Sequence, residues 1–122
     1  MKVLIIDDEE DIRQIASLSL GILGGLEVVE AEGGSDGVDK ATSEKPDVIL
    51  LDMMMPVMDG PSTLAALRDN PSTKEIPVIF LTARAMTSEV ERLKSMGAAG
   101  ILTKPFDPTS LASQVKQILD ER

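Results

Sequence analysis

The feature that most constrains the fold is an alternation, repeated five times, of short apolar runs with segments of helical periodicity. This alternation is typical of strand-helix units in which helices cover both faces of a parallel sheet. The runs at residues 3–6 and 48–51 contain no polar side chain, as expected of central strands buried on both sides. The sequence therefore predicts an α/β protein built from five strand-helix units, forming a single domain over residues 1–122.

The strands are expected at residues 3–6, 26–31, 48–51, 78–81 and 100–103. The first helix is expected to bury one apolar stripe and to end at Gly24 and Gly25, the stripe being Ile12, Ile15, Ala16, Leu20 and Leu23. The second helix, at residues 34–45, is polar, with Val38 and Ala41 as its inward positions. The inward positions of the later helices are expected to be Leu64, Leu67, Val90, Leu93, Met96, Leu111, Val115, Ile118 and Leu119. Pro108 suits the first turn of the last helix.

The composition excludes several kinds of site. The chain has no histidine and no cysteine, which excludes Ser-His-Asp triads, His-ligated metals, disulfides and thiolate chemistry. Its 21 acidic and 12 basic residues give a net charge of −9, which disfavours direct binding to nucleic acid or to anionic membranes. Phe80 and Phe106 are the only aromatic residues, so stacking platforms for bases or flavins are not expected. Chemistry is left to carboxylates, hydroxyls and lysines, and a cytoplasmic location is expected.

Polar residues follow four of the five predicted strands. Asp7 and Asp8 follow the first, Asp52 ends the third, Thr82 ends the fourth and Lys104 follows the fifth. Each alone has a simple explanation, such as a helix cap, a turn or a solvated lysine. Together they fall at the carboxyl edge of one sheet, where open α/β sheets bind ligands. This coincidence predicts a functional site.

The residue types at this edge indicate phosphate chemistry. Three neighbouring carboxylates repel one another unless a cation joins them, and an all-oxygen set suits a hard cation such as Mg²⁺. Lys104 and Thr82 would supply a positive charge and a hydrogen bond to a phosphoryl group. Asp52 is the expected nucleophile, because an aspartate is already ionised at neutral pH and needs no histidine base.

Four ordered motifs carry a resemblance that covers the whole chain: LIIDDE at 4–9, LDMMMPVMDG at 51–60, FLTA at 80–83 and TKPF at 103–106. They resemble the receiver domain of bacterial two-component response regulators, and in particular the stand-alone chemotaxis type. The resemblance implies a doubly wound, flavodoxin-like sheet with strand order 2-1-3-4-5. It also implies a phosphorylation-controlled signalling switch that catalyses only its own phosphorylation and dephosphorylation.

The resemblance assigns a role to each residue of the expected site. Asp7 and Asp8 would hold Mg²⁺, directly or through water, with Asp52 and the backbone carbonyl of Met54. Asp52 would be the phosphoacceptor, Thr82 would bind a phosphoryl oxygen and Lys104 would pair with the phosphoryl group.

Further positions would tune the switch. In this family the Lys104–Pro105 bond is usually cis. Ile101 stands where the family usually has a tyrosine or phenylalanine, and an isoleucine is shorter than either aromatic residue and lacks the tyrosine hydroxyl. Met54 and Arg84 would flank the phosphoryl group; either they shield it from water and prolong the phosphorylated form, or they only pack at the rim.

The resemblance also implies partners. A histidine kinase or a phosphotransfer protein would donate the phosphoryl group, because the chain has no histidine of its own. A protein effector would bind the face made by the fourth helix, within residues 85–99, the fifth strand and the fifth helix. No direct contact with nucleic acid or membrane is expected, and the protein would be a monomer or a phosphorylation-dependent dimer.

Three alternative functions fit the sequence less well. A phosphatase of the haloacid dehalogenase type resembles a pattern with a second aspartate where Met54 stands. A flavodoxin-like electron carrier would need a phosphate-binding loop after the first strand and aromatic residues around the flavin. A binding module that is never phosphorylated would be expected to lack one of the acids or the lysine, and all are present.

Overall fold

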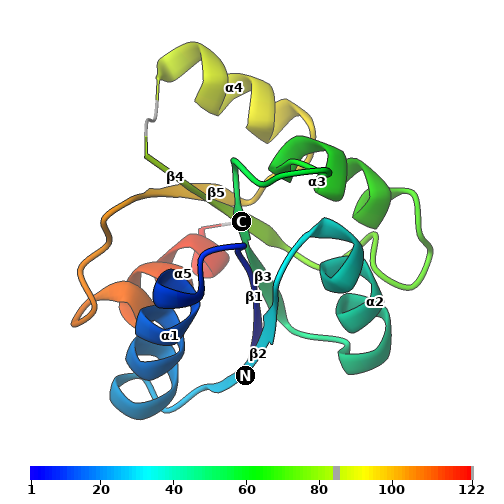
Figure 1. The fold of residues 1–122 in the computed structure, drawn as a ribbon. Coiled ribbons are helices and arrows are strands. Elements are labelled where there is room, and N and C mark those ends of the chain that lie inside the picture. The colour runs from blue at the N-terminus through cyan, green and yellow to red at the C-terminus, as the bar shows by residue number, and fades with distance from the viewer. Residues whose placement is uncertain (84–85, 122) are drawn as a thin grey trace.

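The computed structural model describes residues 1–83 and 86–121 (Figure 1). Its elements in chain order are β1 (Lys2–Ile6), α1 (Glu10–Leu18), η1 (Ser19–Leu23), β2 (Glu27–Ala31), α2 (Gly34–Glu44), β3 (Val48–Asp52), α3 (Gly60–Arg68), β4 (Val78–Thr82), α4 (Thr87–Ser95), β5 (Gly100–Thr103) and α5 (Leu111–Asp120). The strands form one five-stranded sheet in the order β2-β1-β3-β4-β5, and every neighbouring pair is parallel. The predicted α/β fold and strand order are therefore confirmed.

Helices cover both faces of the sheet, with α1 and α5 on one side and α2, α3 and α4 on the other (Figure 1). Successive strand residues point to opposite faces, so each strand contributes to two hydrophobic clusters. In β1, Val3 and Ile5 join the cluster under α1 and α5, whereas Leu4 and Ile6 join the cluster under α2, α3 and α4. This double burial explains why the central strands are unbroken apolar runs.

The first helix differs from the predicted stripe. α1 continues into η1, a π-helix in which the Gly24 amide donates to the Ser19 carbonyl at 3.0 Å. The wider turn shifts the helical phase, so that neighbouring Ser19 and Leu20 are both buried. Leu23, predicted to face inward, is 65% exposed, and Ile15 is exposed as well. A 3.6-residue period does not anticipate such a turn.

The polar α2 packs through small residues. Ala41 is buried as predicted, and so is Gly37, at which a β-carbon would collide with the side chain of Ile6. The helix therefore approaches the sheet more closely than any residue with a side chain would permit. This explains how a helix with few apolar positions is held on the sheet.

The last helix begins later than expected. α5 starts at Leu111, so Pro108 lies in the preceding turn and not in the first turn of the helix. The carbonyl of Pro108 accepts a hydrogen bond from the buried hydroxyl of Ser19, which joins this turn to η1. Pro108 is thereby held by its carbonyl, a contact that no local sequence pattern signals.

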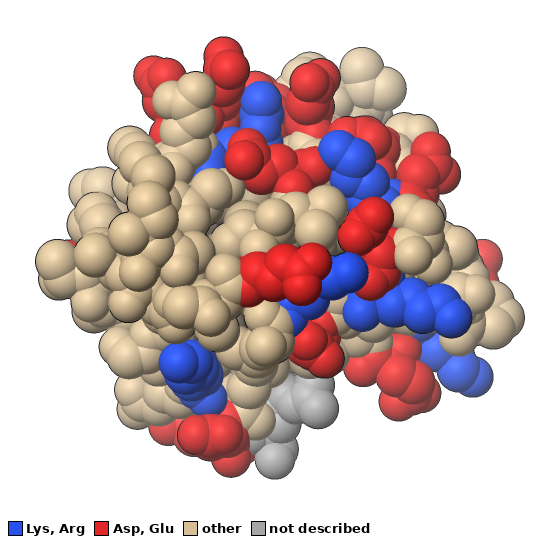
Figure 2. Space-filling view, turned by 90° about the horizontal axis from the view of Figure 1, so that it is seen from below, with Lys and Arg blue, Asp and Glu red and all other residues tan. Residues whose placement is uncertain are grey.

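Charge is unevenly distributed over the surface. Figure 2 shows acidic and basic side chains interleaved on one part of the lower face, beside a broad area without charge.

A shallow groove of about 310 Å³ lies against η1, lined by Ile15, Leu18, Ser19, Ile22, Leu23 and Pro108. Among the described residues, no helix is long and apolar enough to cross a membrane.

Candidate phosphoacceptor site

Four polar residues lie at the carboxyl edge of the sheet, as predicted. Asp52 and Thr82 are the last residues of β3 and β4, Asp7 follows β1, and Lys104 follows β5. Because β1, β3, β4 and β5 are consecutive parallel neighbours, their carboxyl ends lie side by side. Asp7, Asp52 and Thr82 are all buried. The site is thus made by the ends of four strands and by the loops that follow them.

Lys104 links the two buried carboxylates. Its Nζ donates to Oδ2 of Asp7 at 2.9 Å and to Oδ1 of Asp52 at 3.0 Å. Glu9 lies farther away, with its Oε1 at 3.9 Å from the same amino group. The lysine side chain is itself largely buried, so its charge is poorly screened by solvent. It compensates the negative charges of Asp7 and Asp52.

Asp7 is held through its backbone as well as its side chain. Its amide donates to the carbonyl of Ala31 at 3.1 Å, which fixes it to β2. Its Oδ1 accepts a hydrogen bond from the amide of Glu9 at 2.9 Å. Its carbonyl accepts one from Nη1 of Arg13 at 2.7 Å. The turn that leads from β1 into α1 is therefore closely specified.

Burial raises the pKa of Asp52 to about 6, against an opposing hydrogen bond from Lys104. The nearby charge of Asp7 acts in the same direction as burial. Burial lowers the pKa of Lys104, but the hydrogen bonds from its amino group to Asp7 and Asp52 outweigh this effect and the pKa is raised overall. At neutral pH the site thus holds a protonated lysine and a mainly ionised Asp52.

The acidic residues are close enough to share a cation. Carboxylate oxygens of Asp7, Asp8, Glu9 and Asp52 all lie within 4.8 Å of one another. Oδ2 of Asp52 is buried and has no hydrogen-bond partner. A buried carboxylate oxygen without a donor is unfavourable, and a divalent ion would satisfy it. A group of oxygen ligands with several net negative charges fits a hard cation such as Mg²⁺.

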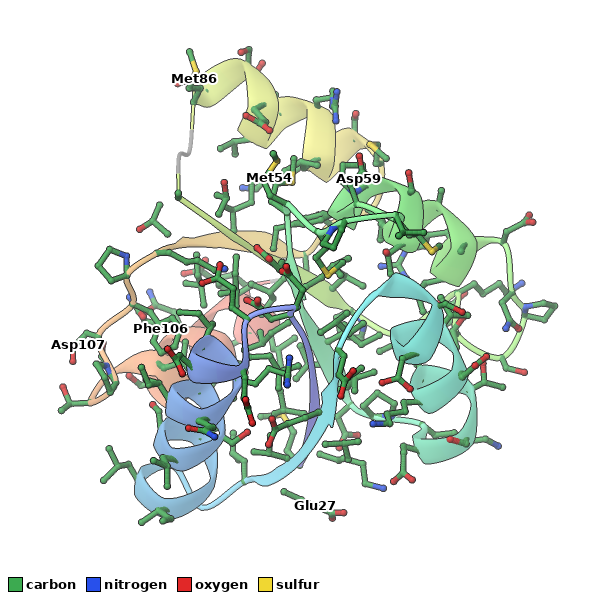
Figure 3. The ribbon with its side chains drawn as sticks, in the orientation of Figure 1. Glu27, Met54, Asp59, Met86, Phe106 and Asp107 are labelled. Carbon is green, nitrogen blue, oxygen red and sulfur yellow. The ribbon has the colours of Figure 1, made fainter. Side chains whose placement is uncertain are left out.

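Backbone contacts tie the loops of the site together. The amide of Lys104 donates to the carbonyl of Thr82 at 2.8 Å, which joins the ends of β5 and β4. The amide of Gly60 donates to the carbonyl of Met53 at 3.0 Å, which closes the loop between β3 and α3. Met54 lies in this loop with its side chain 79% exposed, on the side that faces α4 (Figure 3). It follows Asp52 by two residues in the sequence.

A family model for the response regulator receiver domain matches residues 3–116. The chain belongs to the response regulator receiver family. Receiver domains act in two-component signal transduction as phosphoacceptors and bind Mg²⁺ at an acidic cluster. They are signalling switches rather than classical enzymes, and they work with histidine kinases and downstream effectors.

Curated relatives of this receiver domain include regulators of two lengths. The transcriptional regulatory protein PrrA of Mycobacterium tuberculosis is 40% identical over 124 residues, which cover 99% of this chain and 51% of the relative. A probable chemotaxis protein CheY of Rhizobium etli is 34% identical over 118 residues, covering 97% of this chain and 92% of the relative. The chain thus spans about half the length of the first curated relatives it matches and nearly the whole of the chemotaxis protein.

Solved structures agree with the receiver fold. The chemotaxis response regulator CheY4 of Vibrio cholerae is 36% identical, with a TM-score of 0.88 over 96% of this chain and 97% of that one. A putative response regulator from Chloroflexus aurantiacus is 32% identical, with a TM-score of 0.87 over 98% of this chain.

The structure brings the predicted site residues of the receiver domain to one edge, namely Asp7, Asp8, Asp52, Met54, Thr82 and Lys104. The Lys104–Pro105 bond is cis, as the resemblance implied. Ile101 lies in β5 and packs, partly buried, against the cluster under α4. Arg84 lies outside the described residues.

Two residues near the site were not predicted from the sequence. Glu9 adjoins the Asp7-Asp8 pair and contributes to the acidic group, so its place in the motif was a usable signal. Arg13 contacts the carbonyl of Asp7 from the first turn of α1. Its identity gave no signal, because an arginine near a helix start is ordinarily a surface residue.

Proposed function

We propose that Asp52 accepts a phosphoryl group from a histidine kinase or a phosphotransfer protein and thereby switches a protein-interaction face. The observation that carries the proposal is the setting of Asp52. Its carboxylate is buried beside Asp7, with Oδ1 bonded to Lys104 and Oδ2 without a partner. Most buried polar atoms of a protein have a hydrogen-bond partner, so a buried carboxylate oxygen without one favours a functional role for Asp52.

In the transfer step, a carboxylate oxygen of Asp52 forms a bond to phosphorus as the bond from phosphorus to the donor breaks. With a phosphohistidine donor the phosphorus–nitrogen bond breaks, and its electron pair stays with the imidazole. Lys104, whose amino group contacts the Asp52 carboxylate at 3.0 Å, forms an ion pair with the phosphoryl oxygens and stabilises their negative charge. The hydroxyl of Thr82 donates a hydrogen bond to one of the same oxygens. Neither role requires a histidine in this chain.

Asp7, Asp8, Asp52 and the backbone carbonyl of Met54 would hold Mg²⁺. Both carboxylate oxygens of Asp7 already accept hydrogen bonds, from Glu9 and Lys104. We therefore assign direct ligation to Asp8 and Asp52 and ligation through water to Asp7. When bound, the ion neutralises charge on the transferring phosphoryl group.

Phosphorylation replaces the single negative charge of the Asp52 carboxylate with a phosphoryl group that carries about −1.5 to −2. This charge draws Lys104 and Thr82 toward the phosphoryl oxygens and alters the loops that follow β4 and β5. The face made by α4, β5 and α5 then changes its affinity for a protein effector. Ile101 lies within this face at the position of the usual switch aromatic. Because an isoleucine cannot make the swing of an aromatic ring, we expect the backbone of these loops to carry more of the change.

We infer a single receiver domain over residues 1–122 that works in the cytoplasm as a monomer or a phosphorylation-dependent dimer. It catalyses only its own phosphorylation and dephosphorylation. Its net charge of −9 argues against direct contact of this domain with nucleic acid or with a membrane surface.

The proposal is tested by intact-mass measurement after incubation with Mg²⁺ and acetyl phosphate. The wild-type protein is expected to gain one phosphoryl group, and chelation of the metal is expected to prevent the gain. Asp52→Asn, which keeps the shape of the side chain, is expected to gain none. If the folded wild-type protein stays unmodified with acetyl phosphate and with phosphoramidate, the protein is a binding module that is not phosphorylated.

A further inference from the structure

Arg13 makes two contacts from the first turn of α1. Nη1 donates to the carbonyl oxygen of Asp7 at 2.7 Å, and Nε lies 3.4 Å from Oε1 of Glu30 on β2. Its side chain is only 11% exposed, which is unusual for an arginine. The guanidinium thus lies between β2 and the turn that carries the acidic residues.

The local structure explains this reach. Side chains of an α-helix slope toward its amino end, so a long side chain at position 13 extends back over the turn that precedes α1. The planar guanidinium then donates through Nη1 to the Asp7 carbonyl, while Nε stays within ion-pair distance of the Glu30 carboxylate. A lysine at this position has a single amino group, which cannot reproduce the two contacts with the same geometry.

We propose that Arg13 is a positioning residue for the divalent cation. By holding the carbonyl of Asp7, it fixes the turn through Asp8 and Glu9 and so sets the spacing of their carboxylates from Asp52. The inference rests on the proposed metal site, and it assigns to Arg13 a part in cation affinity without contact between its side chain and the ion.

Glu30 makes this arrangement compatible with cation binding. An unpaired guanidinium beside the acidic group would repel a divalent ion. Paired with Glu30, the arginine keeps its hydrogen-bonding geometry while its charge is largely compensated. Lys40 donates to the carbonyl of Glu30 at 2.5 Å, which helps to hold this residue of β2 in place.

A positioning role and a purely electrostatic role of Arg13 predict opposite changes in Mg²⁺ affinity when this residue is replaced. If Arg13 acted only through its charge, removing that charge would strengthen cation binding. If it positions the turn, removing it weakens cation binding even though a repelling charge is lost. Substitutions of groups that orient metal ligands typically reduce affinity by about 10- to 100-fold.

The experiment is a titration of the metal-free protein with magnesium chloride in an isothermal calorimeter. Calorimetry is chosen because the chain has no tryptophan or tyrosine whose fluorescence could report binding. Arg13→Met, which keeps the length of the side chain, is expected to weaken Mg²⁺ binding about tenfold. Arg13→Lys, which keeps the charge, is expected to weaken it by a smaller factor. Lys74→Met removes a charge from an exposed residue between α3 and β4, at the opposite edge of the sheet, and is expected to leave binding unchanged.

A second readout separates positioning from a general loss of stability. The rise in melting temperature caused by saturating Mg²⁺ reports affinity for the folded state. A structural role alone would lower the melting temperature of the variants with and without the ion by the same amount. A smaller Mg²⁺-induced rise in Arg13→Met or Arg13→Lys supports the proposal. Unchanged or tighter binding in both variants, with the fold retained, overturns it.

Mg²⁺ binding by the wild-type protein distinguishes a failure of the proposed metal site from a failure of the positioning role of Arg13. If wild type binds Mg²⁺ and is phosphorylated on Asp52 while both Arg13 variants bind equally well, only the positioning role fails. If wild type itself binds no Mg²⁺, the proposed metal site fails, and the positioning role fails with it.

Discussion

The α-carbon of Gly60 faces the backbone carbonyl of Asp52 so closely that a β-carbon at position 60 would lie 2.6 Å from that oxygen. We therefore expect Gly60→Ala to push the loop away from the end of β3 and to lower the free energy of unfolding by about 2 kcal/mol. Urea denaturation measures this change. Gly21→Ala is the matched control, because its new β-carbon meets nothing closer than 3.7 Å. Equal stability of the two variants would contradict the prediction.

Lys104→Met should destabilise the metal-free protein. The change leaves the buried carboxylates of Asp7 and Asp52 without their shared cation, and breaking a buried pair in this way costs about 3 kcal/mol. Because Mg²⁺ would restore the missing positive charge, we expect its addition to raise the melting temperature of the variant more than that of the wild type. Thermal denaturation with and without Mg²⁺ measures both effects. An equal rise in the two proteins would show that the lysine and the ion do not compensate the same charges.

Asp59 should make the stability of α3 depend on pH. Its Oδ1 accepts a hydrogen bond from the amide of Ser62 at 2.8 Å, and this contact holds the pKa of Asp59 below its ordinary value of 3.8. A carboxyl whose pKa is lowered by folding stabilises the protein above its unfolded pKa and loses this effect as the pH falls through its folded pKa. We expect Asp59→Ala to cost about 1 kcal/mol at neutral pH. The difference from wild type should shrink below pH 3.8.

Denaturation of wild type and variant at each pH measures this difference directly, since acid effects elsewhere in the chain cancel. Asp59→Asn keeps an acceptor for the Ser62 amide but does not titrate. It should therefore stay close to wild type at neutral pH. A gap between wild type and Asp59→Ala that is constant across the pH range would exclude the titration of Asp59 as its source.

Val57 is expected to lower the free energy of unfolding, compared with a residue that tolerates the backbone conformation at this position. It has a φ angle of +67°, a left-handed conformation that a β-branched residue adopts only with strain, and its side chain is fully exposed. Asparagine tolerates this conformation and no packing is lost, so Val57→Asn should raise the free energy of unfolding by about 1 kcal/mol. Chemical denaturation measures the gain, and a loss of stability would refute the prediction. Val57→Thr, which remains β-branched, serves as the control.

Met54→Ala should shorten the lifetime of the phosphorylated protein. The exposed methionine stands at the rim two residues beyond Asp52, where its bulk would hinder the approach of water to the phosphoryl group. Intact-mass measurement after removal of the phosphodonor gives the rate of decay. Met54→Leu keeps the bulk and should decay like wild type, and combining Met54→Ala with Arg84→Ala should shorten the lifetime further. No change in any variant would mean that these residues only pack at the rim.

The strands and the site were predictable for the same physical reason. Strands buried on both faces must be continuous apolar runs, so each polar residue that ends a run marks the edge of the sheet. Every strand was predicted to within one residue of each of its ends. The parallel order of the strands then places Asp7 and Asp52 within hydrogen-bonding distance of Lys104.

The features that escaped prediction depend on contacts between distant segments. The π-helical turn at Ser19 shifts the buried face of the first helix, and Ser19 is held there by Pro108, far away in the sequence. Arg13 donates to a backbone carbonyl. Because every residue has such a carbonyl, this contact cannot be predicted from the sequence. The polar second helix is explained by Gly37, whose lack of a side chain is what brings the helix close to Ile6.

The backbone hydrogen bond from the Lys104 amide to the Thr82 carbonyl has a mechanical consequence for the switch. The residue that would sense the phosphoryl group through a hydroxyl and the residue that would bind it through a charge are joined at their main chains. A pull on either side chain is therefore transmitted to the ends of both strands. We expect the ends of β4 and β5 to respond together, so that a partner of this face would meet two concerted states of the two strand ends.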